Sequence, residues 1–212
     1  MTRGRFIAFE GGEGMGKSTQ ARLLADWLQR DGVTVELTRE PGGTPGAEAI
    51  RNLLLSPPGE GWTPEAEALL FAAARTDHVA RRIRPALDAG SWVVCDRFID
   101  SSRAYQAIAG GLGDDKVSQL HRIGSAGLLP DLTLLIDAPN DAVAARLAKR
   151  DGDTSDAIGG RAADYHAAVN AAFRDFANIE PDRFAVIDGS GSIEEVHQQV
   201  VAAISQRFEV TA

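Results

Sequence analysis

A glycine-rich segment near the start of the chain reads Gly11-Gly12-Glu13-Gly14-Met15-Gly16-Lys17-Ser18 and matches the pattern G-x-x-x-x-G-K-[ST]. It lies between a strand-like run, Phe6–Glu10, and a helix-like run, Lys17–Arg30. Glycines at such a turn let backbone N–H groups point inward at phosphate oxygens, and the positive end of the following helix adds to the attraction. We expect Lys17 to reach the β- and γ-phosphates and the Ser18 hydroxyl to bind Mg²⁺. The sequence therefore predicts a site for a nucleoside triphosphate with Mg²⁺.

The remainder of the chain alternates short β-rich runs with longer helix-like runs, which is typical of parallel β-α-β units. Strands are expected at Phe6–Glu10, Thr34–Thr38, Trp92–Cys95, Leu132–Ile136 and Phe184–Ile187. Helices are expected at Lys17–Arg30, Gly46–Leu55, Pro64–Ala89, Lys116–Ser125, Pro139–Arg150, Arg161–Ile179 and Ser192–Arg207. The pattern predicts a three-layer α/β fold, with helices on both faces of a five-stranded parallel sheet.

Composition limits the classes of protein to which the chain can belong. Its 212 residues predict a single domain, 1–212, and 22 basic against 30 acidic residues give a net charge of −8. That charge argues against nucleic acid or an anionic membrane as a partner, and no apolar run is long enough to predict a membrane span. A single cysteine, Cys95, fits a reducing cytoplasm. The polar, glycine-rich run 151–160 predicts a mobile lid or a plain linker, with the lid segment at about 146–161.

Further chemistry-bearing residues fall at the ends of predicted strands. Arg39 follows the second strand, and Asp96 and Arg97 follow the third. In open α/β sheets this edge binds ligands, so Asp96 could hold Mg²⁺ through water and Arg97 could clamp a phosphate. Phe71 and Arg75 lie one helical turn apart, which suits a ring stacked on a flat base and a guanidinium at its polar edge. In isolation these residues could equally form a structural ion pair and core packing.

No asparagine is followed by lysine, so the Asn-Lys-x-Asp pattern of GTPases is absent from the sequence. Motor and transporter ATPases are usually larger and carry further motifs. A small α/β chain with several arginines near strand ends favours phosphoryl transfer to a small acceptor.

These segments together resemble the thymidylate kinase family, whose members transfer the γ-phosphate of ATP to dTMP, giving dTDP and ADP for dTTP synthesis. The resembling segments run in the family's order along nearly the whole chain: residues 9–19, 38–44 (Thr-Arg-Glu-Pro-Gly-Gly-Thr), 71–75, 96–98 with 101–106, and 130–137. The resemblance implies a nucleoside monophosphate kinase fold with a mobile lid, Mg²⁺ with ATP as phosphoryl donor, and a homodimer.

The resemblance also implies roles for individual residues on the acceptor side. Phe71 is similar to the ring that stacks on thymine, and Arg75 to the donor that meets its O4. Ser102 lies where a small polar residue contacts N3, and Gln106 belongs to the same dTMP-binding set. Tyr105 resembles the aromatic residue that leaves no room for a ribose 2′-hydroxyl.

Other roles concern the phosphates and the metal. Glu13 looks like the residue that contacts the acceptor's 3′-hydroxyl, Arg39 and Arg97 like the clamp on its phosphate, and Asp96, with Ser18, like the metal site. The implied ATP-binding residues are Gly11, Gly12, Glu13, Gly14, Met15, Gly16, Lys17, Ser18, Thr19 and Arg146.

Residues 12–15 contain no cation, so the resemblance implies catalytic arginines in the lid. We expect Arg150 to act on the transferring phosphate beside Lys17, Arg39 and Arg97, and Arg146 to contact adenine or phosphate. Where many members carry an Asp-Arg pair, this chain has Asp156-Ala157. Either Arg161 substitutes for the missing arginine or Arg150 acts alone.

Two alternatives remain open at this point. One is a kinase for a different nucleoside monophosphate, and the other is a nucleotide-binding switch without catalysis. The pattern of Phe71, Arg75, Ser102 and Tyr105 disfavours the first, and the intact Lys17 disfavours the second.

Overall fold

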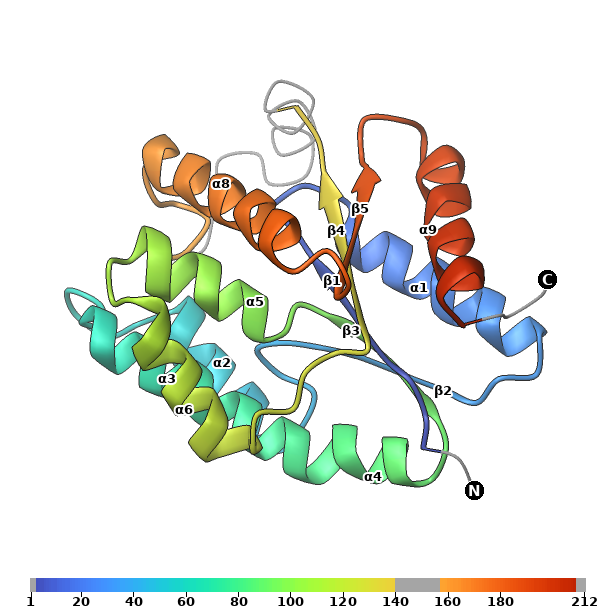
Figure 1. Cartoon of the computed structure of the whole chain (residues 1–212). Coiled ribbons are helices and arrows are strands. Elements are labelled where there is room, and N and C mark those ends of the chain that lie inside the picture. The colour runs from blue at the N-terminus through green and yellow to red at the C-terminus, as the bar shows by residue number, and fades with distance from the viewer. Residues whose placement is uncertain (1–2, 140–156, 209–212) are drawn as a thin grey trace.

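The computed structural model describes residues 3–139 and 157–208. Five strands form one parallel sheet in the order β2-β3-β1-β4-β5 (Figure 1). They are β1 (Phe6–Glu10), β2 (Val35–Arg39), β3 (Trp92–Asp96), β4 (Leu132–Asp137) and β5 (Phe184–Asp188). Every predicted strand is confirmed, with each end displaced by no more than one residue. The carboxyl ends of β2, β3 and β1 are brought to one edge, where Arg39 lies opposite Asp96 and Asp96 opposite Phe9.

Helices cover both faces of the sheet, as the three-layer prediction requires (Figure 1). Alternate side chains of β1 point to opposite faces: Ile7 and Phe9 pack with Leu24 of α1 on one side, and Phe6 and Ala8 pack on the other. All five residues of β1 are buried because the strand lies at the centre of the sheet. This gives the glycine-rich loop that follows it a rigid base.

The described helices are α1 (Lys17–Arg30), α2 (Pro45–Leu55), α3 (Pro64–His78), α4 (Arg84–Asp88), α5 (Ile99–Ser102), α6 (Asp114–Ser125), α8 (Ala163–Ile179) and α9 (Ile193–Phe208), with π-helical turns η1 (Val79–Ile83) and η2 (Arg103–Ala109). No described helix is both long enough and apolar enough to cross a bilayer. The predicted helix Pro64–Ala89 is a continuous helical run of α3, η1 and α4, with its π turn just before Pro85, where proline lacks the N–H that an α-helix needs.

One helical run was not predicted, and one predicted helix cannot be compared with the structure. The helical run of α5 and η2, residues 99–109, was not among the predicted helices. The predicted helix Pro139–Arg150 lies almost entirely outside the described residues, as does most of the lid segment at 146–161.

Candidate active site

The glycine-rich loop connects β1 to α1 and is shaped by its glycines. Gly11 has a φ of 134°, and a Cβ at this position would lie 2.4 Å from the backbone oxygen of Ile136. Gly16 caps α1 in the left-handed conformation, with a φ of 87°. These positions require glycine because other residues rarely adopt such angles and the first has no space for a side chain.

Lys17 is buried at the start of α1, and its ammonium group donates a hydrogen bond to the backbone oxygen of Gly12. Burial, followed by the neighbouring Arg97 cation, lowers the pKa of Lys17 to about 7, against the opposing effect of Asp96. A bound polyphosphate would supply negative charge at this point. The geometry therefore fits the predicted phosphate-binding role of Lys17.

Ser18 and Asp96 come together at the sheet edge, where the Ser18 hydroxyl donates a hydrogen bond to Oδ2 of Asp96. The other carboxylate oxygen of Asp96 is buried and has no hydrogen-bond partner among the described residues. A buried oxygen without a donor is suited to a cation, and Mg²⁺ is commonly held by one or two protein oxygens together with substrate phosphates. The described part of the chain contains no cluster of three or more His, Cys, Asp or Glu side chains with metal-binding geometry.

Arg97 lies between the loop and the neighbouring pocket. Its guanidinium donates to the Gly11 backbone oxygen at 3.2 Å, to Ser101 Oγ at 3.1 Å and to Tyr105 Oη at 3.4 Å, and stands 5.2 Å from the centre of the tyrosine ring. The backbone of Arg97 is left-handed, with a φ of 68°. A residue other than glycine is strained there, so the surrounding contacts must hold this conformation in place.

Those contacts include the carboxylate of Glu10, the last residue of β1. Its Oε1 accepts hydrogen bonds from the backbone N–H groups of Phe98 at 2.7 Å and Ser101 at 3.0 Å, and its Oε2 accepts one from Ser101 Oγ at 2.6 Å. Glu10 is fully buried. Burial, followed by the nearby Asp100 carboxylate, raises the pKa of Glu10 to about 7.

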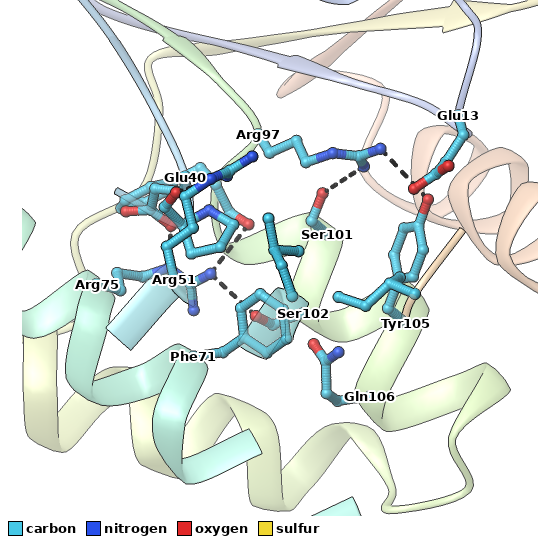
Figure 2. Close-up of a pocket in the computed structure, with 14 residues that line it drawn as sticks. Glu13, Glu40, Arg51, Phe71, Arg75, Arg97, Ser101, Ser102, Tyr105 and Gln106 are labelled. Atoms are coloured by element: carbon cyan, nitrogen blue, oxygen red, sulfur yellow. Dashed lines mark hydrogen bonds and ion pairs between the residues drawn. The ribbon is translucent and has the colours of Figure 1, made fainter. Parts of the chain in front are cut away.

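A pocket opens beside the loop, and most of the predicted acceptor residues line it (Figure 2). Predicted residues in its wall are Glu13, Phe71, Arg75, Arg97, Ser102, Tyr105 and Gln106. They come from the glycine-rich loop, α3, the end of β3, and the run of α5 and η2. The structure thus brings together residues that are up to 93 positions apart in the sequence, from Glu13 to Gln106.

Arg75 is the most constrained of these side chains. It is 4% exposed, and its Nε donates to Glu40 Oε2 at 2.7 Å while its Nη2 donates to Ser102 Oγ at 2.9 Å and to the Phe98 backbone oxygen at 3.2 Å. Glu40 also contacts His78 Nδ1 at 3.0 Å. Although burial raises the pKa of Glu40, Arg75 and His78 lower it below its ordinary value. Arg75 therefore enters the pocket already oriented by a buried ion pair.

The outcome for Arg39 differs from that for Arg97. Arg39 is exposed, and its Nη2 pairs with both carboxylate oxygens of Glu48, at 3.0 and 3.1 Å. It lines a second, adjacent cavity together with Ser18 and Asp96 instead of the pocket that holds Phe71. Its role on the acceptor phosphate stays a prediction.

The lid residues are described only in part. Arg146, Arg150 and Asp156 lie outside the described residues, and Ala157 is exposed. Arg161 is described, and it donates hydrogen bonds to Glu67 and to the hydroxyl of Tyr165. Its guanidinium is thus bound to protein groups beside the pocket in this structure.

The structure adds pocket residues that the sequence analysis did not single out, above all Arg51, Leu55 and Ile158. Arg51 comes from α2 and donates to the backbone oxygen of Pro41 at 2.8 Å. It is the single basic residue of the predicted helix Gly46–Leu55, and this isolated positive charge could have indicated a phosphate-binding role from the sequence. Leu55 and Ile158 have no such signal, because apolar residues are common throughout the sequence and do not by themselves indicate a pocket.

Comparisons of sequence and of structure with known proteins all identify the same family. Residues 9–200 match the family model described as thymidylate kinase. The thymidylate kinase of Rhizorhabdus wittichii is 54% identical over 95% of this chain and 97% of its own length, and that of Chromohalobacter salexigens is 48% identical over 98% of both. The crystal structure of thymidylate kinase from Ehrlichia chaffeensis superposes with a TM-score of 0.78 at 34% identity, over 95% of this chain and 99% of that one. This chain therefore belongs to the thymidylate kinase family.

Proposed function

We propose that the pocket beside the glycine-rich loop holds dTMP while the loop holds ATP, so that the chain carries out the reaction of its family, transfer of the γ-phosphate of ATP to dTMP. One observation carries this assignment of the pocket. The Arg97 guanidinium lines the pocket and also donates to the backbone oxygen of Gly11 in the loop. One cation thus faces the positions where a donor and an acceptor phosphate would meet.

The thymine ring stacks on Phe71, and Arg75 donates to its O4. Tyr105 is 5% exposed and packs edge-on to Phe173, with ring centres 6.5 Å apart. A side chain held this firmly resists displacement, which supports steric exclusion of a 2′-hydroxyl. Glu13, which lines the same pocket, accepts a hydrogen bond from the sugar's 3′-hydroxyl.

Phosphoryl transfer between two phosphates requires charge neutralisation and alignment more than a general base. Lys17 binds the β- and γ-phosphates, and Arg97 binds the acceptor phosphate, with Arg51 as a second cation in the same pocket. Ser18 and Asp96, whose Oδ1 is buried without a hydrogen-bond partner among the described residues, would hold Mg²⁺, which would neutralise further phosphate charge. Arg39 assists from the adjacent cavity, and Arg146 and Arg150 act from the lid.

An ADP-release assay with ATP and each of dTMP, dUMP, UMP, AMP and GMP tests the proposed function. We expect dTMP to be the best acceptor. Uracil lacks one methyl group, a difference that costs only about 1–3 kcal/mol, so dUMP should be a poor substrate. Preferred turnover of AMP or GMP would favour another nucleoside monophosphate kinase. ATP binding without turnover of any acceptor would favour a switch.

A homodimer in the cytoplasm completes the proposal. The packed helices α3 and α6 each expose a large apolar side chain, Leu69 at 55% and Ile123 at 76%. We propose that these two side chains contribute to the subunit interface, which would bury them. Sedimentation of the native chain and of Ile123→Asp tests the dimer, which we expect the substitution to weaken.

A further inference from the structure

The side-chain amide of Gln106 has a defined orientation in the pocket. Gln106 is 3% exposed, and its Nε2 donates to Glu67 Oε1 at 2.9 Å. Its amide oxygen accepts no hydrogen bond from any described residue, and the amide points into the pocket in Figure 2. The side chain thus directs its amide oxygen, an acceptor, toward the space for a bound base, while Glu67 accepts from one N–H of its NH₂ group.

Glu67 enforces this orientation. It is 9% exposed, and its Oε2 accepts a hydrogen bond from Arg161, with which the carboxylate forms an ion pair. An ionised carboxylate can only accept hydrogen bonds, so Gln106 must turn its NH₂ group toward Glu67 and its oxygen away. Arg161 also donates to the Tyr165 hydroxyl, which donates in turn to the Tyr105 backbone oxygen at 2.7 Å.

Another wall of the same pocket has the opposite polarity. Arg75 can only donate, and three of its hydrogen bonds to Glu40, Ser102 and the Phe98 backbone fix its position. A base between Arg75 and Gln106 therefore meets a donor at one point and an acceptor at another. Thymine and uracil match this arrangement with an O4 acceptor next to an N3–H donor. Cytosine reverses both groups, because it carries an amino donor next to an N3 acceptor.

We propose that Glu67 is a specificity-determining positioning residue: by fixing the Gln106 amide it makes the pocket select keto pyrimidine nucleotides over the amino pyrimidine dCMP. This inference rests on the proposed function. Glu67 does not touch the substrate and acts through Gln106. Since thymine and uracil share the same hydrogen-bonding edge, the residue contributes to rejection of dCMP and not to the choice between dTMP and dUMP.

Substitution of Glu67 by glutamine tests the proposal, because glutamine can donate to the Gln106 oxygen and so permits the reversed amide. We expect E67Q to lower the ratio of kcat/KM for dTMP to that for dCMP by about tenfold, the value of one neutral hydrogen bond. The ratio for dTMP to dUMP should stay unchanged. E67D keeps an acceptor-only group and should retain the discrimination against dCMP. The exposed Glu65, two residues away on α3, provides the matched control E65Q, which should behave as the native chain.

Two more variants separate the amide orientation from general effects of the substitution. R161Q removes the ion pair but leaves the carboxylate, so the ratio for dTMP to dCMP should be retained. Q106M removes the acceptor and should reduce the ratio even if E67Q proves too unstable to assay. The proposal is overturned if E67Q or Q106M keeps the native ratio, if E67D loses as much as E67Q, or if R161Q reproduces the loss. Failure of the native chain to phosphorylate dTMP would instead refute the proposed function.

Discussion

The buried carboxyl group of Glu10 makes the stability of the fold depend on pH in a direction opposite to that of most carboxylates. Its pKa in the folded chain is raised from 4.5 to about 7 by burial, so the folded state favours the protonated form. Between these two values the folded chain binds more protons than the unfolded chain. The free energy of unfolding therefore falls as the pH rises through this window.

The size of the effect follows from the shift. One pKa unit corresponds to 1.36 kcal/mol, so a shift of roughly two and a half units removes about 3 kcal/mol between pH 4.5 and pH 7. Glu10→Gln removes the titration. A glutamine oxygen can still accept from the backbone of Phe98 and Ser101, and its NH₂ can donate to Ser101 Oγ. We thus expect E10Q to gain stability relative to the native chain as the pH rises, by about 3 kcal/mol in total.

Urea unfolding of both chains, followed by circular dichroism from pH 5 to pH 8, measures this difference directly. Other titrating groups, including Lys17, are present in both chains and cancel in the comparison. The exposed Glu65 gives a control, because E65Q should follow the native curve. Parallel curves for the native chain and E10Q across the whole range would refute the assignment of a raised pKa to Glu10.

Three further predictions concern Lys17, Arg75 and Gly11. Because the pKa of Lys17 is lowered to about 7, the side chain is mostly neutral at pH 8, and binding of the ATP phosphates should cause it to take up close to one proton. Calorimetry in buffers of different ionisation enthalpy measures this uptake, which Lys17→Met should abolish. Arg75→Met leaves the carboxylate of Glu40 buried with only His78 as a partner, so the free energy of unfolding in urea should fall by about 3–5 kcal/mol. Adding Glu40→Gln should restore part of this loss. An unchanged urea midpoint for Arg75→Met would contradict a stabilising role for the ion pair. Gly11→Ala places a Cβ against the backbone of Ile136 and should abolish binding of a fluorescent ATP analogue. Gly59→Ala, at a position with open space around it, should leave that binding unchanged.

The fold could be predicted because its signals are local in the sequence. Each strand is a short apolar run between turns, and the glycine pattern before Lys17 occurs at one kind of strand-to-helix connection. The pairing of Phe71 with Arg75 was likewise predictable from helical spacing, since both belong to one segment. These predictions needed no knowledge of how distant segments pack.

Contacts between distant segments could not be predicted in the same way. Arg39 follows a strand just as Arg97 does, yet Glu48 holds it in the adjacent cavity. The helical run 99–109 begins directly after the strained turn at Arg97, and it was not predicted. No local sequence pattern predicts the hydrogen bond between Gln106 and Glu67 or the position of Ile158 in the pocket wall.

The left-handed backbone at Arg97 has a consequence for engineering. Such a conformation costs an ordinary residue about 1–2 kcal/mol, and glycine or asparagine adopts it more readily. Laboratory evolution that rewards heat resistance alone would therefore have reason to accept either residue at position 97, and it would discard the guanidinium that we propose binds the acceptor phosphate. Directed evolution of this scaffold should score activity in every round.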